Sequence, residues 1–292
     1  MSYFVLLLGV VFCSTSIIFI KHSTIESEFL SSYRTLLAAL LLSPLCFYDL
    51  KFKKDVYLKD YIKVSFLPGV LLAIHFISWM YGARLAEPAN CSLIVNLTPL
   101  ATPLFLFLLI KEKLTKREII CTITVMCGVA ILAFYDFNES TDFFLGDIIC
   151  LLSMTFFALY LIYGRKYKKL DSLWLYVACL YAWCGILCFI VGIAIGKEPF
   201  INFDSNNIKQ IIYLAAATTI LGHSLLNYAM KHIRGQIVSI VNQFQFIFGA
   251  IWGVIFFERI PSIPFYIACL FLILGCFIAV YKPKKIKPIE SN

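Results

Sequence analysis

Two stretches of the chain, SLIVNLTPLATPLFLFLLIKEK at 92–113 and VSIVNQFQFIFGAIWGVIFFER at 238–259, determine its fold. Each is a long apolar run that ends in charged residues. A shift of 146 residues places Asn96 on Asn242 and Glu112 on Glu258. The same shift also matches four further identities: Ser78, Ala83, Ile94 and Val95 fall on Ser224, Ala229, Ile240 and Val241. Because 146 is half of the 292 residues, we predict an internal repeat that covers the chain.

The composition indicates whether this chain folds in water or in a membrane. Hydrophobic residues make up 61% of the chain and charged residues only 14%, and the mean hydropathy is +0.87. Soluble proteins contain about 25% charged residues. The composition therefore excludes a soluble enzyme, a disordered protein and a nucleic-acid-binding domain. A helix needs about 20 apolar residues to cross a bilayer. Ten segments meet this requirement: 3–20, 29–48, 62–83, 87–110, 118–135, 143–163, 174–195, 209–230, 234–257 and 262–281.

Five of these segments fall in each half, and an odd number forces the two halves to insert in opposite orientations. We therefore predict an all-α membrane protein with ten transmembrane helices. It is built as two inverted five-helix repeats at 1–140 and 141–281, followed by a basic cytoplasmic tail at 282–292. Inverted repeats of this kind are typical of secondary transporters, which bind their solute near the midplane between the halves. Transport then proceeds by alternating access.

The positive charges indicate the orientation. If both termini are cytoplasmic, the cytoplasmic segments hold 19 Lys and Arg residues and the outer connections hold 4. This asymmetry follows the positive-inside rule. We expect a multi-pass protein of the cell (inner) membrane with both termini in the cytoplasm. The net charge of +8 then reflects topology and contact with the lipid bilayer, and it requires no nucleic-acid partner.

Amide side chains within the apolar segments are the first candidates for a binding site. Polar groups in lipid are costly, so they normally face the bundle interior or a wet cavity. Asn96 and Asn242 are equivalent in the repeat, and Gln245 lies on the same helical face as Asn242. We expect this face to line a central substrate cavity. The alternative is that these amides only hydrogen-bond neighbouring helices.

Imidazole and aromatic residues provide a second group of candidates. His75 and Trp79 share one face of the third segment, and His223 shares a face of the eighth with Asn227, next to Tyr228. Histidine can exchange a proton near neutral pH, so His75 and His223 are candidates for proton coupling as well as substrate binding. Trp79 and Tyr228 could form an aromatic wall. The alternative for each is a purely structural role.

Charged residues complete the candidate set. Arg34 lies within the second segment and could bind a carboxylate or phosphate. Alternatively, Arg34 extends to the outer surface or pairs with Glu26, Glu28 or Glu87. Glu112 and Glu258 close the fourth and ninth segments beside Lys113 and Arg259. We interpret these two glutamates as ion pairs at the helix ends, with gating as the other possibility.

Three segments resemble the drug/metabolite transporter superfamily, and more narrowly its EamA-type ten-helix permeases: FLSSYRTLLAALLLSP (29–44), NLTPLATPLFLFLLIKEKLT (96–115) and NQFQFIFGAIWGVIFFERI (242–260). The family pattern is matched by Arg34, Pro99, Pro103, Glu112 and Glu258. Gln245 and Gly249 stand where prolines are expected in the ninth helix. The resemblance implies transport of amino acids or other metabolites, with S-adenosylmethionine and nucleotides among the solutes of the family.

We therefore predict a secondary active transporter for a small polar or amphipathic metabolite, such as an amino acid. An importer or exchanger of S-adenosylmethionine or a nucleotide-like metabolite is the alternative, and a non-transporting membrane scaffold is the alternative from another class. No catalytic, ATP-binding or metal-ligand motif is present, so we expect no enzyme, no cofactor and no metal. Coupled protons or a counter-solute could drive transport. The protein is expected to be a monomer or a homodimer.

Overall fold

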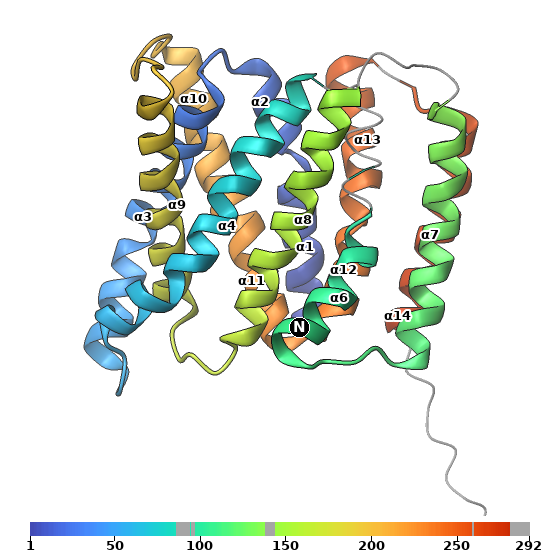
Figure 1. Ribbon diagram of the computed structural model, residues 1–292, viewed down its shortest axis with the longest axis horizontal. Helices are drawn as coiled ribbons and strands as arrows, with labels where there is room; N and C mark the ends of the chain where they lie inside the picture. Colours follow the sequence, from blue (N-terminus) through green and yellow to red (C-terminus); the bar gives the residue numbers. More distant parts are fainter. Residues whose placement is uncertain (86–93, 95–96, 138–143, 259, 281–292) are drawn as a thin grey trace, which may run out of the picture.

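The computed structural model describes residues 1–85, 94, 97–137, 144–258 and 260–280, and the regular structure in these ranges is entirely helical. Lipid offers no hydrogen bonds to the backbone, so a segment this apolar must satisfy its own N–H and C=O groups, which a helix does. Figure 1 shows the helices running between two opposite sides of the molecule, with some helices in front of others.

The helices follow the ten predicted segments. The helical elements are α1 (Ser2–Ser14), α2 (Ser16–His22), α3 (Ser27–Phe52), α4 (Leu58–Leu85), α6 (Thr98–Ile110), α7 (Lys116–Phe137), α8 (Phe144–Lys166), α9 (Leu173–Ala194), α10 (Ser205–Tyr213), η1 (Leu214–His223), α11 (Ser224–His232), α12 (Gly235–Asn242), α13 (Phe244–Phe257) and α14 (Ile263–Val280). Among the described residues, 8 helical stretches are long and apolar enough to cross a membrane, and Thr98–Ile110 is a shorter apolar helix. The prediction of a helical membrane protein is confirmed.

Packing between the helices pairs the first half of the chain with the second. α3 packs against α9 and α7 against α14, so the second and fifth segments of one half meet their own equivalents in the other. α4 packs against α8, and η1 and α11 pack against α1 in the corresponding way. The third segment of each half therefore lies against the first segment of the other half. The space between the halves is where a site shared by both can form.

The ends of α6 and α13 align the two repeats more accurately than the sequence identities do. Each helix ends at a residue in the left-handed conformation, Lys111 with φ 56° and Glu258 with φ 54°. The structural counterpart of Glu258 is therefore Lys111, and Glu112 lies one residue further along. This difference matters for the predicted ion pairs, because the two glutamates do not occupy equivalent places.

The connections divide the molecule into two chemically different sides (Figure 1). The connections at 53–57, 111–115, 167–172 and 233–234 lie on one side, which we call the basic side. The connections at 23–26 and 195–204 lie on the opposite side, which we call the acidic side. This alternation is the topology that the charge pattern requires.

Candidate functional site

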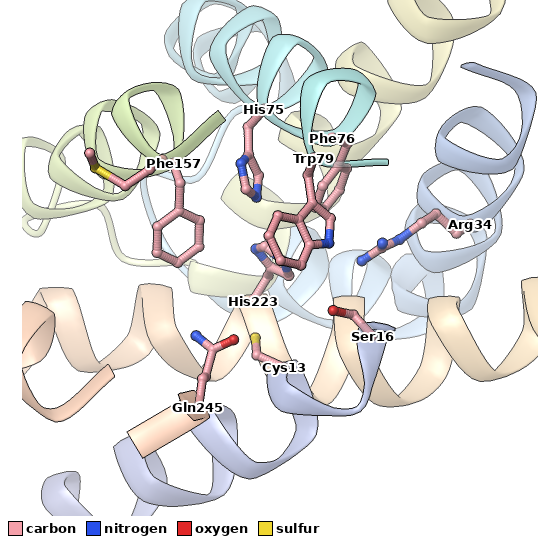
Figure 2. A pocket seen from close by; sticks show the side chains of 10 residues that line it. Cys13, Ser16, Arg34, His75, Phe76, Trp79, Phe157, His223 and Gln245 are labelled. Carbon is pink, nitrogen blue, oxygen red and sulfur yellow. The ribbon is translucent and has the colours of Figure 1, made fainter. Parts of the chain in front are cut away.

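A small cavity of about 40 Å³ lies between the two halves. It lies where α1, α3, α4 and α8 meet η1 and α13, so both halves supply its walls (Figure 2). Small-molecule sites usually combine apolar walls with a few polar groups. The lining has this character: Cys13, Ser16, Arg34, His75, Phe76, Trp79, Met154, Phe157, His223 and Gln245.

Arg34 is the charged member of this lining, and it is only 1% exposed. Its Nε donates to the Thr219 hydroxyl at 3.1 Å, and its Nη2 donates to the Thr218 hydroxyl at 2.9 Å. The guanidinium carbon lies 4.1 Å from the centre of the Phe76 ring, which is cation–π geometry. Neutral hydroxyls and an aromatic face therefore hold the charge in place.

The π-helix η1 explains why both hydroxyls reach Arg34. The Thr218 and Thr219 hydroxyls both donate to the Leu214 carbonyl, at 2.8 and 2.9 Å. The wider turn of a π-helix shifts successive side chains relative to an α-helix, and such turns occur frequently at functional sites. Here the shift brings two adjacent threonines to one guanidinium.

The expected alternatives for Arg34, an ion pair or extension to the surface, are wrong for the residues described. Glu26 and Glu28 pair instead with Lys197 on the acidic side, at 2.5 and 3.3 Å. No described carboxylate lies within ion-pair distance of Arg34, and Glu87 lies outside the described residues. Removing an ion from water costs several kcal/mol even after the protein relaxes. A buried guanidinium that faces a cavity, with no counter-ion in the described part of the chain, is therefore a strong indication of function.

The two intramembrane histidines converge on the same cavity although they are not equivalent in the repeat. The His75 Nδ1 contacts the Ser153 carbonyl and hydroxyl at 3.0 and 2.9 Å, and the His223 Nδ1 lies 2.6 Å from the Tyr160 hydroxyl. The ring centres are 6.1 Å apart. Each ring is thus fixed through Nδ1 to α8, and neither Nε2 is hydrogen-bonded within the described part of the chain.

The predicted amide pair is only partly visible. Gln245 lines the central cavity, and its Nε2 donates to the Asn242 Oδ1 at 2.6 Å. Asn242 itself lines a neighbouring cavity between α6, α8 and α12, and Phe157 borders both cavities. Asn96 lies outside the described residues, so its pairing with Asn242 stays a prediction.

Asn227 and Tyr228 lie away from the central cavity. Asn227 donates to the His223 carbonyl of its own helix at 2.9 Å and lies against Gly164 of α8. Tyr228 stacks on His232, with the ring centres 4.2 Å apart. The structure does not bring Tyr228 to Trp79, so the predicted aromatic wall is wrong for this pair.

Five cavity residues were not predicted. Ser16 is a polar residue in an apolar segment, so the criterion that singled out the amides could have found it. The other four are apolar or weakly polar and resemble core residues in sequence: Cys13, Phe76, Met154 and Phe157. Only the way the helices pack distinguishes these side chains from the many similar ones that face lipid or the core.

Glu112 belongs to an ionic cluster on the basic side that joins the two halves. Its Oε2 accepts from the Arg165 Nε at 2.9 Å, and its Oε1 lies 3.8 Å from Arg234. Arg234 also pairs with Glu118 at 2.5 Å, and this hydrogen bond raises the pKa of Arg234 above its usual value. The partner of Glu112 is therefore Arg165 of α8 and not its neighbour Lys113.

Glu258 has no such cluster among the described residues. It is exposed at the end of α13, and Arg259 beside it lies outside the described residues. On the acidic side the corresponding link is made by Lys197, whose ammonium donates to the Glu26 carboxylate at 2.5 Å and to the Tyr81 hydroxyl at 2.7 Å. Burial lowers the pKa of Lys197, but these hydrogen bonds and the nearby Glu28 charge outweigh it and raise the pKa overall.

Comparison with known proteins agrees with this architecture. The sequence model of the EamA-like transporter family matches residues 1–134 and 144–281. A solved structure described as "Crystal structure of protein" superposes with a TM-score of 0.75 over 96% of both chains, and at 14% sequence identity this shows a shared fold alone.

Two curated relatives are also similar over part of their length. "Uncharacterized transporter in sor 3'region" of Acidianus ambivalens is 30% identical over 108 residues, which cover 37% of this chain and 42% of that protein. "Uncharacterized transporter YyaM" of Bacillus subtilis (strain 168) is 25% identical over 157 residues, which cover 52% of this chain and 51% of that protein. The matches thus span about half the length of these relatives or less, and both names indicate a transporter rather than an enzyme. The match of the family model across both halves shows that the chain belongs to the EamA-like transporter family.

Proposed function

We propose that this protein is a secondary transporter that moves a small polar or amphipathic metabolite by alternating access. The observation that carries the proposal is the cavity at the interface of the two repeats, lined by both halves and by fixed polar side chains. A scaffold has no need for a buried guanidinium and two imidazoles turned to an empty space. In a transporter, these groups replace part of the solute's hydration shell.

Two ionic clusters could close the cavity toward opposite sides. Lys197 with Glu26 and Glu28 links the halves on the acidic side, and Glu112 with Arg165 links them on the basic side. Rocking of the halves would open one cluster while the other stays closed. Partly exposed ion pairs are worth little, so the Lys197–Glu26 pair can open at low cost: Lys197 is 25% exposed and Glu26 48%. We place the basic side in the cytoplasm of a cell's inner membrane.

Solute flux through purified protein in proteoliposomes tests the proposal. The vesicles contain radiolabelled amino acids, nucleosides or S-adenosylmethionine, and flux is followed with and without a pH gradient to reveal proton coupling. Phe157→Trp should block flux, because Phe157 is only 5% exposed and the larger ring would fill the cavity.

Phe47→Trp is the matched control, since Phe47 is 70% exposed on α3, and it should leave flux unchanged. Equal flux in the two variants would refute the assignment of this cavity. Absence of flux from the unmodified protein across the panel would favour a scaffold.

A further inference from the structure

Among the described residues, the positive charge of Arg34 in the central cavity has no counter-ion. Arg34 uses Nε and Nη2 to hold Thr219 and Thr218, while its Nη1 has no hydrogen-bond partner among the described residues. The lining residues that the structure describes include no aspartate or glutamate. The Arg34 guanidinium can therefore pair with an anion that enters the cavity.

Further hydrogen-bond donors surround this charge. Figure 2 shows the indole nitrogen of Trp79 turned toward Arg34, and the Ser16 hydroxyl turned into the same cavity. Neither group is hydrogen-bonded to another described residue. The three donors belong to α2, α3 and α4, so separate helices bring them to one cavity. Convergent donors with no acceptor of their own are the arrangement that binds an anion.

His223 extends this donor set. Within the described part of the chain, the Tyr160 hydroxyl has one hydrogen-bond partner, the His223 Nδ1 at 2.6 Å. With the Tyr160 hydroxyl as the donor in this pair, the proton of the neutral ring lies on Nε2. The Nε2–H of His223, a residue of the cavity lining, is then a further donor.

We propose that the cavity binds a small organic monoanion whose carboxylate lies against Arg34, Trp79 and Ser16, and that it discriminates against cations. The proposal rests on the transport function given above and specifies its solute. One guanidinium balances one negative charge, so a dianion would leave a buried charge unpaired. A cationic solute such as a sulfonium compound would meet Arg34 with no acidic side chain of the described lining to offset the repulsion.

The remaining walls suit a flat, largely apolar body. Phe157 and Trp79 face the space, and Met154 adds an adaptable apolar surface. Because the Gln245 Nε2 donates to Asn242, its Oε1 is left to accept one hydrogen bond from the solute. The chemistry of this lining matches an aromatic or similarly planar monocarboxylate.

Three probes of nearly the same shape and different charge test the proposal: benzoate, benzamide and benzamidinium. Binding to the purified full chain is measured by titration calorimetry at constant ionic strength. Hydrogen bonds to charged groups correspond to about 10- to 100-fold in affinity. We therefore expect benzoate to bind at least about 10-fold more tightly than benzamide, with benzamidinium the weakest.

Arg34→Met removes the charge and keeps much of the side-chain volume. It should weaken benzoate binding by about 10- to 100-fold and change benzamide binding by less than about 2-fold. The melting temperature without a probe should hold or rise, because an unpaired buried charge is lost. Lys51→Met removes an exposed charge at the end of α3 and should change neither affinity. Arg34→Lys keeps the charge and should keep the preference for benzoate at reduced affinity.

Several results would overturn the proposal: equal binding of benzamide or benzamidinium, no binding of any probe, or unchanged benzoate affinity in Arg34→Met. Displacement of benzoate by an equal concentration of chloride would also overturn it, since the site would then be a halide site. Proteoliposome flux separates this failure from failure of the transport function. Flux of neutral or cationic solutes that does not depend on Arg34 would support the transport function and refute the anion site.

Discussion

The two glutamates that end equivalent segments of the sequence should differ sharply in their effect on stability. Glu112→Gln removes the charge that Arg165 contacts at 2.9 Å, and these side chains are 13% and 11% exposed. Glu258→Gln removes a charge from an exposed residue with no ion pair among the described residues. The sequence alone predicts that the two substitutions destabilise the protein similarly. The structure predicts a large loss of stability for Glu112→Gln and a small one for Glu258→Gln.

The magnitude follows from the contacts that survive. A hydrogen bond to a charged group contributes about 1.5–3 kcal/mol, and breaking a fully buried ion pair costs about 3–5 kcal/mol. Arg165 also donates to the carbonyls of Met230 and Ile233, at 3.2 and 2.8 Å, so it is not left unpaired. We therefore expect the lower range, about 1.5–3 kcal/mol, for Glu112→Gln. An exposed substitution such as Glu258→Gln should stay within about 0.5 kcal/mol.

Thermal unfolding of the purified variants in one detergent measures this difference. At roughly 2–4 °C per kcal/mol, Glu112→Gln should lower the melting temperature by about 3–10 °C, and Glu258→Gln by less than about 2 °C. A double-mutant cycle with Arg165→Met should show a coupling of at least about 0.5 kcal/mol for Glu112. Equal shifts for the two glutamates, or fully additive effects with Arg165, would refute this reasoning.

Two further predictions follow from the packing and the repeat. Asn96→Ala combined with Asn242→Ala should abolish solute flux in proteoliposomes while folded protein still reaches the membrane; unchanged flux would remove both amides from the site. Gly82→Ala should destabilise the protein by about 1–3 kcal/mol, because its Cβ would lie 2.5 Å from the Cys150 sulfur and 3.3 Å from the Cys150 nitrogen. Gly249→Ala meets nothing within 4 Å and should be neutral or stabilising by up to about 1 kcal/mol, so equal melting temperatures for these two glycine variants would contradict the packing described.

The fold could be predicted from sequence because a membrane-spanning helix can be recognised by the length of its apolar segment. A helix covers at least part of each of the ten predicted segments, since apolar length alone decides whether a segment can cross lipid. The π-helix at Leu214–His223 could not be predicted. Its apolar sequence predicts a helix but not a wider turn. That turn is supported by contacts with Arg34 and with α1, which only tertiary packing supplies.

The site was predictable to the extent that polarity in lipid is conspicuous. Arg34, His75, Trp79, His223 and Gln245 were singled out in this way, and all five line one cavity. Their partners were not predictable. An arginine is expected to find a carboxylate, and only the packing of α3 on η1 shows that two threonines take that place.

Apolar cavity residues carry no sequence signal of their own. Phe157 lines the cavity on a helix that is aromatic along much of its length, so only its position relative to α4 and η1 identifies it.

Accessibility of residue 245 from the two sides of the membrane tests the central claim most directly. Gln245→Cys is introduced after the eleven native cysteines have been replaced. A membrane-impermeant anionic thiosulfonate is then added to right-side-out cells and to inverted vesicles. Alternating access around this cavity predicts labelling from both sides, and a transported solute should slow it from both. Labelling from one side only, under every condition of solute and gradient, would contradict the account.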